Sequence, residues 1–184
     1  MEPRTLQTPL TPEMVDSLTA GEEVRLTGVI YTARDQAHKR LCALLAAGEP
    51  LPLELKGAVI YFAGPTPPPP GKPVGSAGPT TSGRMDAFSP ALIAAGLPGM
   101  IGKGTRAPEV IEAMKRHGAV YFAATGGAGA LIAQCIKTST CIAYPELGPE
   151  AIYRMDVEDL PLVVAIDRRG GNLYQSGPAA YRKA

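Results

Sequence analysis

Aromatic residues and net charge are both scarce in this sequence. The 184-residue chain contains no tryptophan, aromatic residues make up 5% of it, and its formal net charge at pH 7 is only +1. Proteins that bind nucleic acid by neutralising many phosphates need an excess of lysine and arginine, and recognition of bases or sugars by stacking needs aromatic rings. The composition therefore argues against a nucleic-acid partner and against a stacking site.

Long apolar runs are also missing. No segment approaches the roughly 20 apolar residues that a membrane-spanning helix needs. The first residues of the chain lack the basic-then-apolar layout of a secretory signal peptide. The sequence thus predicts no membrane association, and we expect a cytoplasmic protein.

Side chains that bind metals are few and scattered. The three cysteines are Cys42, Cys135 and Cys141, and the two histidines are His38 and His117. No two cysteines form a CxxC pair. Cys42 and Cys135 lie in apolar stretches typical of buried helices, and Cys141 opens an apolar strand. We therefore expect all three to be core residues, and we expect this chain alone to bind neither a metal nor a cofactor.

The chain is long enough for one sizeable hydrophobic core. Its 45% hydrophobic and 19% charged residues are typical of a soluble globular protein, and neither an internal repeat nor a linker divides it. We therefore predict a single domain over residues 1–184. Inside it, residues 65–79 form a proline-rich loop that can join neither a helix nor a strand ladder, because proline has no N–H group. A stiff connector is the simpler interpretation, and a ligand for an SH3-type domain is the alternative.

Apolar stretches of strand length alternate with stretches of helical periodicity. Predicted strands cover residues 24–31, 58–63, 100–104, 119–124, 140–144 and 162–166; predicted helices start at Pro12 and after residue 130 and cover 35–45, 82–95, 108–117 and 148–153. Asp35 is the expected N-cap of its helix, and a turn at 167–172 leads to Tyr174 and a loose tail that contains Lys183. The alternation predicts an α/β domain with a mainly parallel or mixed sheet.

The stretch Gly78–Asp86 combines turn residues with the hydroxyls of Thr80, Thr81 and Ser82 and the guanidinium of Arg84, just before an apolar periodic run. A helix that starts here presents unpaired N–H groups and the positive end of its dipole, and an arginine can hold a carboxylate with two parallel hydrogen bonds. The stretch is therefore a candidate anion site. In the alternative interpretation, a hydroxyl merely caps the helix and the arginine is a solvated surface charge.

Two further cations stand at strand ends. Arg34 lies where a strand passes into a helix, the place where open α/β folds bind ligands, and Lys103 lies between two glycines that allow a ligand to approach closely. Arg34, Arg84 and Lys103 together suit a small substrate with two carboxylates. The hydroxyl of Thr80 is a poor base unless a cation or a metal lowers its pKa. His38, one turn after Arg34, is better placed to take part than His117, so the residues suggest half of an active site.

A glycine-rich turn, residues 125–130, follows the predicted strand 119–124. Its spacing matches neither GxGxxG nor GxxxxGK[ST], so nucleotide binding is the weaker interpretation. Close packing of a strand against a helix, or of a partner's backbone, explains these glycines equally well.

Five motifs in order resemble the β subunit, equivalently the C-terminal domain, of class I fumarate hydratases and of the related L-tartrate dehydratases. They are Thr32–Arg40, Gly78–Asp86, Ile101–Gly104, Gly126–Ala130 and Glu146–Ala151. The resemblance extends from about residue 10 to residue 174. The glutamine at position 36 stands where many relatives have a small residue, and this departure leaves Arg34 unaffected.

The resemblance implies a swivelling β/β/α domain with a mixed, partly parallel sheet. It implies reversible hydration of a dicarboxylate, fumarate to malate, at a 4Fe–4S cluster whose cysteine ligands belong to a partner α subunit. This chain would then be inactive alone, and αβ pairs would form a dimer. Carried over by motif, Arg34, Arg84 and Lys103 are substrate-carboxylate ligands with Thr81 and Ser82 beside them, and Thr80 is the catalytic base.

Other interpretations stay open at this point. L-Tartrate is the alternative substrate, because both molecules are small dicarboxylates. The chain could also be a non-catalytic scaffold or anion-binding partner subunit. The sequence does not say whether Asp35 or His38 takes part in the reaction.

Overall fold

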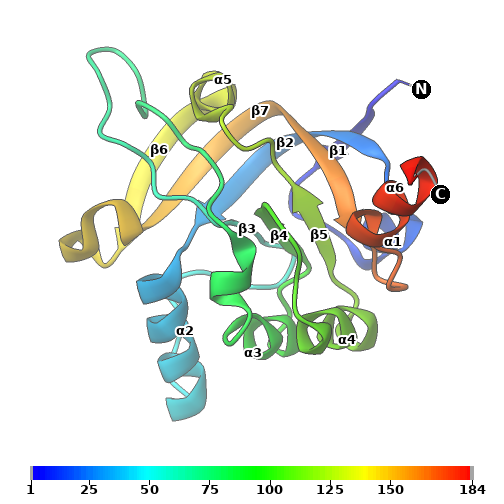
Figure 1. The fold of residues 1–184 in the computed structure, drawn as a ribbon. Helices are drawn as coiled ribbons and strands as arrows, with labels where there is room; N and C mark the ends of the chain where they lie inside the picture. Colours follow the sequence, from blue (N-terminus) through cyan, green and yellow to red (C-terminus); the bar gives the residue numbers. More distant parts are fainter. Residues whose placement is uncertain (1, 183–184) are drawn as a thin grey trace.

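The computed structural model describes residues 2–182 and shows a mixed α/β domain (Figure 1). In chain order its elements are β1 (Arg4–Gln7), α1 (Pro12–Ser17), β2 (Glu23–Thr32), α2 (Asp35–Ala47), β3 (Val59–Tyr61), the 3₁₀ helix η1 (Ser82–Met85), α3 (Ser89–Ala94), β4 (Gly99–Gly102), α4 (Pro108–His117), β5 (Val120–Ala123), α5 (Gly129–Cys135), β6 (Ile136–Ala143), the 3₁₀ helix η2 (Pro145–Glu150), β7 (Ile152–Ile166) and α6 (Leu173–Tyr181).

The strands form one sheet in the order β1-β2-β3-β4-β5-β7-β6. Strands β1 to β5 pair in parallel, whereas β7 pairs antiparallel with β2, β5 and β6. The pairing of β2 with β7 closes β2, β3, β4, β5 and β7 into a barrel. The prediction of an α/β domain with a mixed, partly parallel sheet is confirmed.

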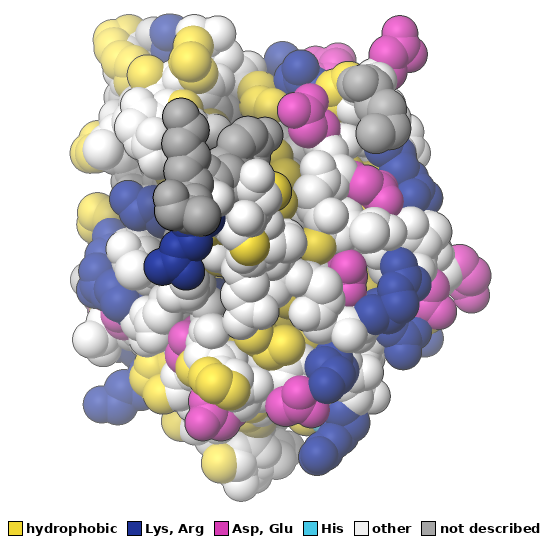
Figure 2. Space-filling view, turned by 45° about the vertical axis from the view of Figure 1, so that its right-hand side comes forward, with side chains coloured by type: hydrophobic (Ala, Val, Ile, Leu, Met, Phe, Trp, Pro, Cys, Tyr) yellow, Lys and Arg dark blue, Asp and Glu magenta, His cyan; other side chains and the backbone are white. Residues whose placement is uncertain are grey.

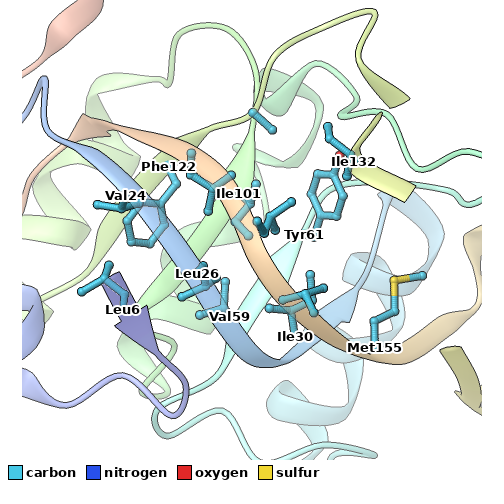
Figure 3. Packing of buried hydrophobic residues seen from close by; sticks show 14 of the residues in the cluster. Leu6, Val24, Leu26, Ile30, Val59, Tyr61, Ile101, Phe122, Ile132 and Met155 are labelled. Carbon is cyan, nitrogen blue, oxygen red and sulfur yellow. The ribbon is translucent and has the colours of Figure 1, made fainter. Parts of the chain in front are cut away.

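Two hydrophobic clusters lie on the two faces of this sheet. Val59 and Tyr61 of β3 belong to the cluster shown in Figure 3, together with Ile101 and Phe122 of the neighbouring strands. Ile60, between them in sequence, points to the second cluster, beneath α2, α3 and α4. Alternate residues of a strand face opposite sides of a sheet, so a strand that is buried on both sides reads as a continuous apolar run. This is why the central strands could be predicted from sequence.

Because β2 to β5 run in parallel, their carboxyl ends meet at one edge of the sheet. The segments that leave this edge begin at Ala33, Phe62, Lys103 and Ala124. Helices α2, α3 and α4 pack side by side below the strands in Figure 1, and the proline-rich loop projects on the other side, near β6 and α5. We call the edge at which strands β2 to β5 end the carboxyl edge.

The proline-rich loop is closed at its base. The backbone N–H of Thr66 donates to the Ser76 carbonyl over 2.9 Å, and the Gly75 N–H donates back to the Thr66 carbonyl over 3.2 Å. The loop therefore leaves the domain and returns to nearly the same place, and residue 77 re-enters the fold at a fixed position. No helix or strand forms between residues 64 and 78, as the prolines predict.

Several predicted boundaries were wrong. The helix predicted over 82–95 is split into η1 and α3, and Pro90 stands at the start of the second helix, where its missing N–H costs nothing. Asp35 is the first residue of α2, and Arg34 occupies the N-cap position. The strand predicted over 162–166 is the end of the 15-residue β7. β7 starts at Ile152, which leaves only a 3₁₀ turn where a helix was predicted over 148–153.

The ends of the chain and the cysteines also differ from expectation. β1 was not predicted, because a four-residue strand among prolines has a weak pattern. Residues after Tyr174 continue in α6 instead of a loose tail, whereas Lys183 lies outside the described residues. Cys42 and Cys135 are only partly buried, and Cys141 is exposed in the middle of β6. The expectation of three core cysteines was therefore wrong.

Candidate functional site

The segment that carries the hydroxyl-rich motif crosses the carboxyl edge. The N–H of Thr80 donates to the Phe62 carbonyl just after β3 over 2.7 Å, and the N–H of Ser82 donates to the Lys103 carbonyl just after β4 over 2.9 Å. Thr81 also forms an isolated parallel bridge with Lys103. The fold thus brings Thr80 and Thr81 next to Lys103, which lies 22 or more residues further along the sequence.

The side chain of Ser82 fixes the backbone of Lys103 next to the hydroxyl-rich motif. Its side chain is fully buried. Its Oγ accepts a hydrogen bond from the Lys103 N–H at 3.1 Å and lies 2.8 Å from the Tyr121 hydroxyl. That hydroxyl also lies 3.0 Å from the Gly104 carbonyl, to which it donates, and burial raises the pKa of Tyr121 above its usual value, which keeps the donor protonated. Ser82 therefore contacts the backbone of Lys103, and its hydroxyl faces the protein interior.

The two candidate arginines meet at one carboxylate. Arg84 is exposed, and its Nε donates to Asp35 Oδ1 over 2.9 Å. The Nε of Arg34 lies 3.9 Å from Asp35 Oδ2, and its Nη2 lies 3.4 Å from Glu150 Oε1. These contacts join the junction between β2 and α2 to η1 and η2. Arg34 and Arg84 consequently stand on either side of Asp35.

The residues of this edge differ in exposure. Thr81 and Arg84 are exposed, whereas Thr80, Lys103 and Arg34 are partly buried. Groups at such an edge can touch a ligand on one side while the other side faces solvent or a second protein. Chemically, three cations beside a hydroxyl can hold a dicarboxylate and place an oxygen near one of its carbon atoms.

The buried ion pair between Arg106 and Asp86 was not predicted as a functional feature. The Arg106 side chain has no solvent exposure, and its Nε donates to Asp86 Oδ1 over 2.6 Å. Its Nη2 donates to Ser89 Oγ over 2.6 Å, and its guanidinium stacks over Phe62 and Tyr121. Asp86 ends the hydroxyl-rich motif, so the pair fastens that segment to the loop after Lys103. The sequence offered one signal for this ion pair: Asp86 is the acidic residue at the end of a motif whose other residues are neutral or basic.

His38 lies beneath Arg34 and is fully buried. Its Nδ1 lies 2.9 Å from the Arg34 carbonyl, which can only accept, so Nδ1 carries the proton. Its ring packs edge-on against Phe62, and burial lowers the pKa of His38 to about 4. His38 is therefore neutral at physiological pH and holds the backbone at Arg34. His117 is exposed at the end of α4, on the side of the sheet away from the carboxyl edge.

The glycine-rich turn packs closely against the same site. A Cβ on Gly126 would lie 3.5 Å from the Lys103 side chain, and a Cβ on Gly129 would lie 2.9 Å from the Gly78 backbone nitrogen. The Ala77 N–H also donates to the Gly129 carbonyl over 3.1 Å. Close backbone approach accounts for Gly129, and the left-handed φ of +81° accounts for Gly127, which supports the packing interpretation over a nucleotide site.

The donors of this chain do not fit an iron–sulfur cluster. Within the described range, no three His, Cys, Asp or Glu side chains gather closely enough to hold a metal ion. Cys42 lies in α2 against Phe88, Cys135 ends α5, and Cys141 lies in β6. Such a cluster needs several cysteine thiolates that converge on one place.

The molecular surface carries both signs of charge. On the face shown in Figure 2, basic and acidic side chains lie beside one another, in agreement with the near-neutral composition. Residues 2–182 include no helix with the length and hydropathy needed to cross a membrane.

Comparison with known proteins gives a consistent family. Residues 3–177 match the family model described as Fumarase C-terminus. The chain is 45% identical over 152 residues to the anaerobic class I fumarate hydratase of Escherichia coli. The aligned residues cover 82% of this chain and 28% of that protein. It is 39% identical over 164 residues to fumarate hydratase 2 of Leishmania major. This alignment covers 88% of this chain and 29% of that protein.

A third relative is similar over most of its length. A Methanocaldococcus jannaschii protein with the provisional name L(+)-tartrate dehydratase subunit beta is 38% identical over 176 residues, which cover 90% of this chain and 88% of that protein. The chain thus spans 28% to 29% of the two fumarate hydratases above. The resemblance drawn from the sequence motifs is confirmed: this chain belongs to the fumarase C-terminus family.

Proposed function

We propose that this chain is the β-subunit part of an iron–sulfur hydro-lyase that interconverts malate and fumarate. The observation that carries the proposal is the family match over residues 3–177, combined with three cations and a hydroxyl at one sheet edge. The named fumarate hydratases are more than three times as long as the matched segment, so a second domain or subunit supplies the rest of the active site.

In this proposal the cations hold the substrate. A dicarboxylate carries two negative charges, and it leaves water only if opposite charges and hydrogen bonds compensate for the lost hydration. Arg84, Arg34 and Lys103 provide this compensation, and an arginine can also fix the orientation of a carboxylate through two parallel hydrogen bonds. Thr81, exposed beside Lys103, adds a hydroxyl donor.

Thr80 Oγ1 is the proposed base. It takes the proton from the substrate carbon next to a carboxylate, and it returns that proton in the reverse direction. A threonine hydroxyl can do this only when neighbouring positive charge lowers its pKa. The backbone bonds of Thr80 and Ser82 keep the motif next to Lys103, whose ammonium supplies such a charge and also stabilises the negative charge that develops on the substrate.

The metal chemistry is assigned to a partner. Because the cysteines of this chain do not converge, the proposed 4Fe–4S cluster belongs to an α subunit that covers the carboxyl edge, where its Lewis acidity would act on the substrate hydroxyl. The exposure of Thr81 and Arg84 agrees with an edge that a partner covers. The proposed assembly is a dimer of αβ pairs in the cytoplasm, with no role for the chain alone.

The test is co-expression with an α chain related to the remaining part of a class I fumarate hydratase, followed by an anaerobic assay with malate, fumarate and tartrate. Thr80→Ala should lower kcat by about 10²-fold or more, the usual contribution of a general base. Thr5→Ala, an exposed threonine of β1, is the control and should keep full activity. A non-catalytic scaffold or anion-binding subunit would keep its turnover in both variants.

L-Tartrate is the second candidate substrate. The observation that favours it is the 38% identity over 90% of this chain to the relative named for that activity. The ratio of kcat/KM for malate to that for tartrate, measured on the same complex, decides between the two.

A further inference from the structure

The side chain of Asp35 contacts both arginines of the proposed substrate site. Its Oδ1 accepts from Arg84 Nε over 2.9 Å, and its Oδ2 lies 3.9 Å from Arg34 Nε. Arg34 Nε and Asp35 Oδ2 are both buried, and neither has a hydrogen-bond partner among the described residues. These two buried atoms of opposite charge therefore face each other without a closer hydrogen-bond partner for either atom.

These contacts use one particular side of each guanidinium. The Nε of Arg84 faces Asp35, while its side chain keeps 48% exposure. An arginine that is held at Nε is fixed along its length, and its terminal Nη groups stay available for a second carboxylate. We propose that Asp35 is a positioning residue that fixes Arg34 and Arg84 together, so that Arg84 presents its Nη groups to the dicarboxylate and Arg34 presents the Nη group that Glu150 does not engage. This inference rests on the function proposed above.

The local structure explains why an aspartate suits this place. Asp35 is the first residue of α2, where the positive end of the helix dipole favours a negative charge. Its side chain is only 25% exposed, so water screens its attraction to the arginines incompletely. The bond from His38 Nδ1 to the Arg34 carbonyl holds the backbone that carries both residues.

The two arginines depend on Asp35 to different extents. Arg34 has a second counter-ion, because its Nη2 lies 3.4 Å from Glu150 Oε1. Arg84 has no other ion pair among residues 2–182. Loss of the Asp35 charge should therefore loosen Arg84 more than Arg34, and loss of the Glu150 charge should loosen Arg34 alone.

The kinetic test uses Asp35→Asn in the co-expressed complex. We expect KM for the dicarboxylate to rise about tenfold, the scale of one hydrogen bond between charged groups. We expect kcat to change less than about threefold, because Thr80 and Lys103 keep their contacts. Glu146→Gln is the matched control: it removes the same charge from the ion pair between Arg40 of α2 and η2, and KM should stay at the wild-type value. A purely structural role would lower the unfolding temperature without changing KM.

A second measurement does not need activity. In the full chain, NMR signals of the arginine Nε–H groups are assigned with Arg34→Lys and Arg84→Lys variants. Asp35→Asn should speed hydrogen exchange at the Arg84 Nε–H about tenfold, since its acceptor loses its charge. Glu150→Gln should alter the Arg34 signal and leave the Arg84 signal unchanged, and neither variant should alter the Arg40 signal.

The outcomes separate the two proposals. If the wild-type complex converts none of the three substrates, the proposed function is wrong, and the exchange rates still decide whether Asp35 holds the arginines. If the complex is active but Asp35→Asn keeps the wild-type KM and the wild-type exchange rate at Arg84, the positioning role is wrong. If Arg84→Ala raises KM by the same factor in the Asp35→Asn background as in wild type, the two residues are independent, which also contradicts the inference.

Discussion

Replacement of Arg106 by methionine should destabilise this domain strongly. The guanidinium has no solvent exposure, and it binds Asp86 Oδ1 at 2.6 Å and Ser89 Oγ at 2.6 Å. Its Cζ atom lies 5.2 Å from the centre of the Phe62 ring and 5.0 Å from that of Tyr121. Methionine can occupy the apolar space between these rings but cannot replace either hydrogen bond.

The magnitude follows from what the substitution leaves behind. The Asp86 side chain is 15% exposed, and without Arg106 it keeps one charge-neutral donor, the Ala107 N–H at 2.7 Å. Breaking a buried ion pair on one side costs about 3–5 kcal/mol, because the remaining charge is poorly hydrated. We expect a loss near the lower end of this range, about 3 kcal/mol, because Asp86 retains some exposure and one hydrogen bond.

The assay is equilibrium unfolding in urea, followed by circular dichroism. With a dependence on urea of about 2 kcal/mol per molar, the midpoint should fall by about 1.5 M. Arg116→Met on the exposed side of α4 is the control, and it should change the free energy of unfolding by less than about 0.5 kcal/mol. The double variant Arg106→Met with Asp86→Asn should recover about 1 kcal/mol or more, since it leaves no unpaired charge.

Two results would refute this reasoning. A loss below about 1 kcal/mol in Arg106→Met would mean that the buried ion pair contributes no more than an exposed one. A double variant less stable than Arg106→Met alone would mean that the cost does not come from the unpaired Asp86 carboxylate.

Two further expectations concern Gly102 and His38. A Cβ at Gly102 would collide with Ser82 Oγ, so Gly102→Ala should lower the free energy of unfolding by about 1–3 kcal/mol. Gly83→Ala is the control, because its Cβ would meet Asp86 at an ordinary 3.8 Å, and it should be nearly neutral in thermal unfolding. Burial lowers the pKa of His38 from 6.5 to about 4, so the unfolded chain takes up a proton between these pH values that the folded chain excludes. Stability should therefore fall by roughly 3 kcal/mol as pH drops from about 6.5 to about 4, and His38→Leu should reduce this fall in urea titrations at several pH values. An equal fall in stability in the wild type and in His38→Leu would contradict the assignment of this pH dependence to His38.

Much of the fold could be predicted because the central strands are buried on both faces. Ile60 and Tyr61 point to opposite clusters, so the strand that contains them is apolar at every position. The end of α4 was equally readable: the helix predicted over 108–117 ends at His117, and Gly118 after it adopts the left-handed conformation that side chains disfavour. These signals lie in short stretches of neighbouring residues, so they can be read from one sequence without knowledge of the tertiary structure.

β7 shows where such reading fails. Its first half alternates buried Met155 and Val157 with charged Arg154, Asp156 and Glu158, and it pairs with β2 and β6 at long range. Alternation of this kind indicates a strand, but Asp159 and Pro161 interrupt it in the sequence, and pairing with β2 is what continues one strand through them.

The candidate site shows the same division. The sequence by itself determined which chemical groups are present: a hydroxyl-rich turn, cations at strand ends, and cysteines too scattered for a cluster. Only the tertiary structure decided that Ser82 faces inward, that Arg106 is buried, and that Asp35 lies between two arginines. The physical reason is that an ion pair depends on distance in space, and Asp35 and Arg84 are brought within 2.9 Å by the packing of α2 against η1 and not by any pattern along the chain.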